Sequence, residues 1–164
     1  MRPENAAHAL AAYFPEIDTH DPASVRCAHI SLFDHWPSEA EAARVMCYRD
    51  ARARNALADY SDGEQRFLRL YETLARGGLV RHQPAPRRQM DGDEPELSDM
   101  FRASLREETF MDVYFKAPST RIQGRAARTD YVIFTEHSDI ASFQAIVEGH
   151  GLFLLFDPEL GAAH

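Results

Sequence analysis

The sequence predicts an α+β fold, with a small and mostly antiparallel sheet of about three to five strands and helices packed on one face. Three stretches of the 164 residues are typical of strands, because aromatic and β-branched residues are concentrated in them. They cover residues 109–115, 130–135 and 152–156. Elsewhere, apolar residues recur mainly at helical spacing. We therefore expect one domain over residues 1–164, helix-rich over 1–107 and strand-rich over 108–157.

The first half of the chain is expected to contain one strand between helices. Residues 3–13 are rich in alanine and predict a short helix. Alternating side chains over residues 24–33 predict a strand. A serine followed three residues later by a glutamate forms a capping-box pattern at the start of a helix over residues 38–60. The sequence Ser-Asp-Gly-Glu at residues 61–64 predicts a break, and a second helix is expected to end at the following Gly-Gly pair.

The second half is expected to alternate between strands, loops and helices. Residues 79–83 predict a short strand or an extended link. Residues 84–95 contain three prolines and predict a loop that is either a surface loop or a binding arm. A helix is expected over residues 96–106. Ser138 is the expected cap of a last helix over residues 139–148.

Composition narrows the class of protein. Apolar residues make up 45% of the chain, and no apolar run approaches the roughly 20 residues that a membrane span needs. The N-terminal residues lack the apolar segment of a signal peptide, so we expect a cytoplasmic protein without a membrane partner. Cys27 and Cys47 do not form a C-x-x-C pair, and we expect both to be small buried side chains.

The net charge of −8 is distributed unevenly along the chain. Residues 41–90 contain ten arginines and six acidic residues, a net charge of +4. Residues 91–112 contain two arginines and eight acidic residues, a net charge of −6. The negative total disfavours general nucleic-acid binding, because phosphate groups are repelled by it.

The link between the strands expected over residues 109–115 and 130–135 contains four cations and no acidic residue. We expect this link to be an exposed loop that binds a partner, because arginine and lysine side chains suit carboxylate or phosphate groups. The alternative is a solvated connector whose charges balance the acidic residues 91–112. The expected binding residues are Lys116, Arg121, Arg125 and Arg128.

Two groups of histidine and carboxylate residues are alternative sites. The first contains His29, on the less apolar face of its strand, and His35 in the turn that follows. Imidazole and carboxylate groups bind zinc or iron, but no spacing typical of a metal site is present, so no metal or cofactor is expected. The second contains His137 after a strand, a place that suits a general base, although its neighbours are ordinary capping residues. The other members of the first group are Asp18, His20, Asp21 and Asp34.

These patterns predict a non-catalytic protein-binding module, which would be an inhibitor, an immunity-type protein or a regulator from a bacterium or its phage. The reasons are the absence of an organised catalytic motif and the acidic segment beside a basic one, since opposed charges steer association. One alternative is a small enzyme, metal-assisted or acid–base, that uses His29, His35 or His137. Another is a nucleic-acid-binding regulator, because the order helix, turn, helix and Gly-Gly between Arg44 and Arg88 is similar to that of a winged helix.

Overall fold

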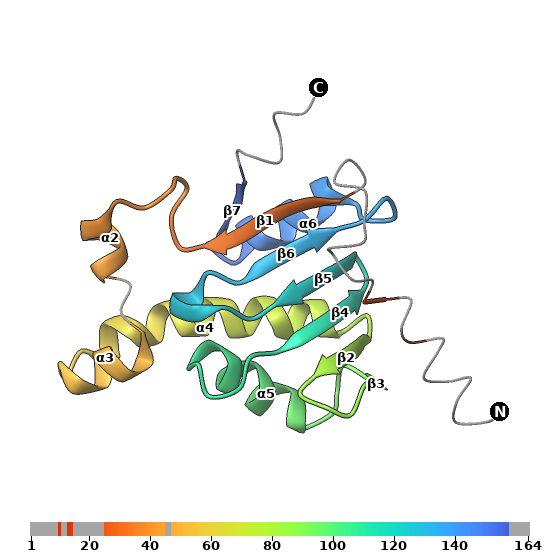
Figure 1. The fold of residues 1–164 in the computed structure, drawn as a ribbon, viewed down its shortest axis with the longest axis horizontal. Helices are drawn as coiled ribbons and strands as arrows, with labels where there is room; N and C mark the ends of the chain where they lie inside the picture. The colour runs from red at the N-terminus through yellow and green to blue at the C-terminus, as the bar shows by residue number, and fades with distance from the viewer. Residues whose placement is uncertain (1–9, 11–12, 15–24, 45–46, 158–164) are drawn as a thin grey trace.

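Seven antiparallel strands form one open sheet in the computed structural model, which describes residues 10, 13–14, 25–44 and 47–157. Their spatial order is β3-β2-β4-β5-β6-β1-β7 (Figure 1). The strands are β1 Arg26–Ser31, β2 Leu79–Gln83, β3 Arg88–Met90, β4 Asp112–Lys116, β5 Ser119–Gln123, β6 Tyr131–Phe134 and β7 Phe153–Phe156. The predicted α+β class and antiparallel sheet are confirmed, but the sheet is larger than the three to five strands expected.

Five α-helices are present in the described part of the chain. They are α2 Glu39–Arg44, α3 Tyr48–Ala53, α4 Leu57–Ala75, α5 Glu96–Leu105 and α6 Ile140–Gly149. Helices α4, α5 and α6 pack on one face of the sheet, where their apolar side chains join those of the strands (Figure 1). None of the helices in the described ranges has both the length and the apolar character that crossing a bilayer requires. Three of the seven strands precede residue 108, so the sheet joins both halves of the chain.

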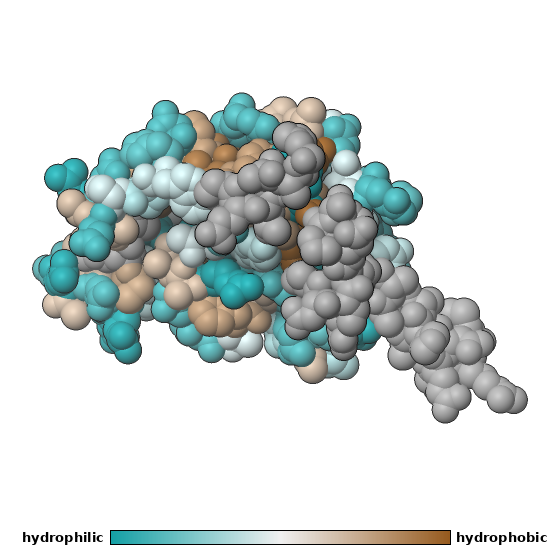
Figure 2. Space-filling view, turned by 45° about the horizontal axis from the view of Figure 1, so that its top comes forward, coloured by the Kyte–Doolittle hydropathy of each residue, from teal (hydrophilic) through white to brown (hydrophobic). Residues whose placement is uncertain are grey.

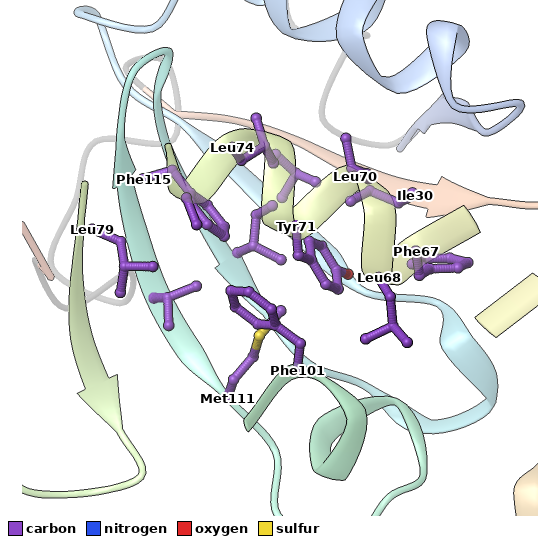
Figure 3. Packing of buried hydrophobic residues seen from close by; sticks show 14 of the residues in the cluster. Ile30, Phe67, Leu68, Leu70, Tyr71, Leu74, Leu79, Phe101, Met111 and Phe115 are labelled. Carbon is purple, nitrogen blue, oxygen red and sulfur yellow. The ribbon is translucent and has the colours of Figure 1, made fainter. Parts of the chain in front are cut away.

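The main core lies between α4, α5 and the sheet. Tyr71 of α4, Phe101 of α5 and Phe115 of β4 have ring centroids 5.4 to 6.3 Å apart (Figure 3). All three side chains are fully buried, and burying a side chain of this size stabilises the fold by about 2 to 3 kcal/mol. Because side chains alternate along a strand, the neighbouring Tyr114 points to the opposite face of the sheet, away from the helices.

Helix α4 runs through the break that the sequence predicts at residues 61–64. Glu64 is buried there, and its carboxylate accepts hydrogen bonds from Nε and Nη2 of Arg106 at 2.6 and 3.1 Å. This contact from Arg106, the residue that follows α5, outweighs the local preference for a turn. The helix predicted over residues 38–60 is instead divided into α2, α3 and the start of α4, and Asn55 takes a left-handed backbone conformation between α3 and α4 (φ 57°).

Two strands occupy segments that were predicted to be loops. Strand β5 lies within residues 116–128, where Thr120 pairs with Phe115 of β4 and Ile122 pairs with Val113. Strand β3 lies within residues 84–95 and pairs with β2.

Of the two helix caps predicted from the sequence, one is confirmed and one is wrong. Ser38 and Glu41 form the predicted capping box, since the Ser38 N–H donates to the Glu41 carboxylate at 2.9 Å and the Glu41 N–H donates to Ser38 Oγ at 3.3 Å. At α6 the cap is Asp139 rather than the predicted Ser138. Ser138 Oγ instead donates to the carbonyl of Ser119 at 2.5 Å and so joins the turn to β5. The helix predicted over residues 3–13 lies largely outside the described residues.

Gly63 should resist replacement by alanine although it lies inside a helix. A Cβ at this position would clash with Nη1 of Arg128 and would lie 3.0 Å from Leu32 Cδ1. We expect Gly63→Ala to lower the free energy of unfolding by about 1 to 3 kcal/mol, because the buried Arg128 side chain would have to move. The measurement is urea-induced unfolding followed by circular dichroism.

The matched control is Gly149→Ala at the end of α6, where a Cβ would meet no atom within 4 Å. There the alanine should raise the free energy of unfolding by about 0.4 to 1 kcal/mol, because it restricts the unfolded chain. Equal effects of the two substitutions would contradict the close packing of Arg128 on α4.

Candidate functional site

The basic segment predicted to be an exposed binding loop is largely part of the sheet. Arg121 lies on β5 and is only 8% exposed. Its Nε and Nη2 donate to the two carboxylate oxygens of Asp112 at 2.9 and 2.7 Å. The prediction of an exposed Arg121 was wrong because the neighbouring strand supplies this carboxylate. Lys116, at the end of β4, is half-buried, and Arg125 is exposed.

Arg128 is also buried, so it does not belong to an exposed loop as predicted. Its guanidinium group lies over the ring of Tyr60 at 4.2 Å from the centroid, and its Nη1 donates to the Tyr60 carbonyl at 3.0 Å. Burial lowers the pKa of Arg128 below the ordinary arginine value. The side chain therefore fastens the segment before β6 to the start of α4.

The acidic segment over residues 91–112 is partly paired with arginines of the same chain. Four of its eight carboxylates lie within ion-pair distance of guanidinium groups, and one of these pairs, Arg121 with Asp112, joins the acidic segment to the basic one. The pairs are Arg88 with Glu94 and Glu96, Arg102 with Asp99, and Arg121 with Asp112.

The structure does not bring the three candidate histidines together. His35 follows the C-terminal end of β1, which contains His29. His137 follows β6, whose last residue, Phe134, pairs with Arg26 at the other end of β1. His35 and His137 therefore lie at opposite ends of these strands. Within the described ranges, no three histidine, cysteine, aspartate or glutamate side chains form a group that could hold a metal ion.

His35 stabilises the turn after β1. Its Nδ1 lies 2.7 Å from Asp34 and its Nε2 lies 3.0 Å from Glu41. The hydrogen bond to Asp34, and then the one to Glu41, raise the pKa of this exposed imidazole. These contacts describe a turn closed by polar side chains. The remaining members of the predicted N-terminal group, Asp18, His20 and Asp21, lie outside the described residues.

The face of the sheet opposite the helices carries a group that we call the aromatic patch, formed by His29, Trp36, Arg125 and Tyr131. The His29 ring lies 5.6 Å from the Trp36 ring and 5.0 Å from the Tyr131 ring. The Arg125 guanidinium group lies over Tyr131, 5.4 Å from its centroid. Trp36 is 51% exposed and Arg125 is also exposed, so this patch presents aromatic and cationic groups to solvent.

Part of the patch could be found from the sequence. His29 was predicted to lie on the less apolar face of its strand, and Arg125 was among the predicted binding residues. Trp36 and Tyr131 were missed. Tyr131 is next to the core residue Val132 in its strand. Because side chains alternate along a strand, this position could have predicted that Tyr131 faces the side of the sheet opposite the core. Trp36 lies in the irregular segment between β1 and α2, where no periodicity indicates its direction.

The other half of the same sheet face is covered by residues of the N-terminal segment. Tyr13 lies 4.7 Å from Tyr114 between ring centroids, and Phe14 stacks on His82 at 4.9 Å. Arg121 lies over the ring of Phe14 at 5.1 Å. These contacts cover β2, β4 and β5, and the aromatic patch lies beyond them on β6 and β1. Figure 2 shows hydrophobic residues on this side of the molecule beside the grey atoms, with hydrophilic residues around them.

Cys27 lies beneath the patch and is buried on β1. Burial raises the pKa of the Cys27 thiol, and burial together with the Cys27 contact raises the pKa of Tyr131. Both groups are therefore protonated at neutral pH, so this thiol lacks the thiolate character of a reactive cysteine. Cys47 is half-buried rather than fully buried.

The loop that carries Arg125 is held by the buried carboxylate of Asp130. The Tyr71 hydroxyl donates to Oδ2 of Asp130, and the Arg125 N–H donates to Oδ1 at 3.0 Å. A second anchor comes from Glu107, whose carboxylate accepts a hydrogen bond from the Ala127 N–H at 2.6 Å. Burial raises the pKa of Asp130 from an ordinary value of 3.8 to about 6.

The same loop contains backbone strain. Ala127 and Arg128 have φ angles of 55° and 53°, in the left-handed region that side chains disfavour. Such residues cost of order 1 to 3 kcal/mol each and persist where surrounding contacts hold them. The anchors to Asp130, Glu107 and Tyr60 supply those contacts and fix the position of Arg125 in the patch.

Asp130 should make the stability of the protein depend on pH. Because its pKa is higher in the folded state than the ordinary value of 3.8, the folded state binds the proton more tightly between about pH 4 and pH 6. The free energy of unfolding should fall by up to about 3 kcal/mol as the pH rises through this window. The asparagine in Asp130→Asn cannot titrate, so this variant should lack that fall in the free energy of unfolding when urea unfolding is measured at several pH values. Parallel pH profiles of the two proteins would contradict the assignment.

Comparisons of the chain with protein-family models, with curated protein sequences and with solved structures give no match. Because a fold alone does not determine function, the function has to be argued from the chemistry of the site. The aromatic patch offers ring faces for stacking and a guanidinium group for an anionic partner, which are the elements of a binding surface.

Proposed function

We propose that this protein is a binding module that holds one partner protein at the aromatic patch. The observation that carries the proposal is Trp36, which is 51% exposed and packs against His29 beside Tyr131 and Arg125. Tryptophan, tyrosine and arginine are the residue types that most often dominate binding energy in protein interfaces. A partner that covers Trp36 would bury apolar area that now faces water.

The patch favours a partner with an apolar side chain and a carboxylate close together. Arg125 is held over Tyr131, and its Nη2 donates to Gln123 at 3.2 Å. Its guanidinium group is exposed and has five N–H donors, so others are available to a carboxylate of the partner. Since the loop anchored by Asp130 fixes this group in advance, little conformational entropy is lost on binding. An inhibitor, an immunity-type protein or a regulator would use such a surface.

The two alternatives from the sequence receive less support. The winged-helix order needs a turn at residues 61–64, but these residues lie inside α4. The net charge of −8 also opposes a nucleic-acid partner. The enzyme hypothesis needs His29, His35 or His137 in an organised site, and β1 and β6 place the last two apart.

The proposal predicts that binding to the partner depends on Trp36. Affinity capture from the native lysate, with this protein immobilised, should retain one stoichiometric partner. Once that partner is purified, Trp36→Ala should weaken its binding by about 30-fold or more, and Arg125→Ala by about tenfold, as measured by calorimetry. The reason is that both side chains would be central and desolvated in the interface.

The matched control is Leu57→Ala, which removes an apolar side chain that is 40% exposed at the start of α4, outside the patch. It should leave the affinity unchanged. A partner that binds the wild type and Trp36→Ala equally well, or the absence of any stoichiometric partner, would contradict the proposal.

A further inference from the structure

A small cleft of about 260 Å³ lies between β2, α5 and the segment before β4, away from the aromatic patch. Its lining combines apolar side chains with one cation, one carboxylate and a hydroxyl group. The lining residues are Arg81, Pro84, Glu96, Met100, Ala103 and Thr109. Its volume is slightly below the usual range of about 300 to 1,000 Å³ for small-molecule sites, so it suits only a small ligand.

Arg81 is the unusual residue in this cleft, because its guanidinium group is buried and poorly paired. The side chain is 10% exposed. Its Nη2 donates to the carbonyl of Pro86 at 3.3 Å, and its Nη1 lies 3.7 Å from Glu96, which is too long for a hydrogen bond. Its Nε has no acceptor within the described part of the chain. A buried guanidinium group is unfavourable without partners, and burial accordingly lowers the pKa of Arg81.

Glu96 provides the opposite charge at the edge of the same cleft. Its carboxylate is half exposed, and Arg88 contacts one of its oxygens from the neighbouring strand β3. The cleft thus presents a cation and an anion whose nearest atoms are 3.7 Å apart, and its lining also includes the apolar side chains of Met100 and Ala103. A ligand with a single charge would pair with one of these groups and be repelled by the other. A ligand with both charges would satisfy both.

We propose that this cleft binds a small zwitterion of the α-amino acid class with an apolar side chain. The ligand carboxylate pairs with Arg81, the ammonium group pairs with Glu96, and the side chain packs on Met100 and Ala103. A carboxylate accepts two hydrogen bonds from a guanidinium group, and the terminal nitrogens of Arg81 have only a 3.3 Å contact to the Pro86 carbonyl and a 3.7 Å contact to Glu96. This inference is independent of the proposed protein-binding function, because the cleft and the aromatic patch share no residue.

The test is calorimetric titration of the purified full chain with three probes that share one carbon skeleton. They are L-leucine, 4-methylpentanoate, which lacks the ammonium group, and 3-methylbutylamine, which lacks the carboxylate. L-leucine should bind saturably at concentrations up to about 10 mM, and the two analogues should bind at least about tenfold more weakly. L-valine, L-methionine and L-phenylalanine extend the panel. No binding by any of the four amino acids, or equal binding by the three matched probes, would overturn the proposal.

Substitutions in the cleft test whether L-leucine binds there. Arg81→Met keeps the aliphatic stem and should weaken L-leucine binding by about tenfold or more, with folding checked by circular dichroism. Glu96→Gln changes a half-exposed position and should remove the preference for L-leucine over 4-methylpentanoate, which keeps the test valid if Arg81→Met does not fold. Arg76→Met, in a different cleft, is the control and should bind L-leucine as the wild type does. Unchanged probe preference in Glu96→Gln would overturn the assignment.

Discussion

The buried carboxylate of Asp130 joins the two layers of this fold. It lies immediately before β6, accepts a hydrogen bond from the Tyr71 hydroxyl of α4 and accepts another from the Arg125 N–H of the preceding loop. A carboxylate with no exposed surface is strongly unfavourable unless such donors surround it, so its contacts define the positions of helix, strand and loop together. The strained backbone at Ala127 is held between this contact at Arg125 and the hydrogen bond from the Ala127 N–H to Glu107, and the Arg125 guanidinium group lies over Tyr131.

Arginine has two different roles in this protein. Arg121, Arg128 and Arg106 are paired inside the chain, where they connect strands to strands or loops to helices. They stabilise the fold because each has a carboxylate, a carbonyl or an aromatic ring as a partner. At the aromatic patch, Arg125 remains exposed, as does Trp36. The sequence suggested that opposed charges would attract a partner, whereas the structure favours a surface of aromatic rings and one guanidinium group.

The sequence correctly predicted those strands and helices in which the spacing of the apolar residues alone shows which face is buried. Strand β1 is an example, since Ala28 and Ile30 join the main core and His29 faces the other side as expected. Strand β5 was missed because the charge of Arg121 conceals the alternation of its neighbours, and its burial depends on a carboxylate from another strand. For the same reason the patch was predicted only in part, since Trp36 and its neighbours come together through strand pairing between distant segments.

The central claim is that the contact between Tyr71 and Asp130 holds the loop in place for the patch. Hydrogen exchange of the backbone amides in Tyr71→Phe, which removes only the hydroxyl group, tests it most directly. The Arg125 and Ala127 amides should exchange about tenfold faster than in the wild type, while the amide of Ile122 in the neighbouring strand β5 keeps its protection. Wild-type exchange rates throughout residues 124–130 in this variant would contradict the claim.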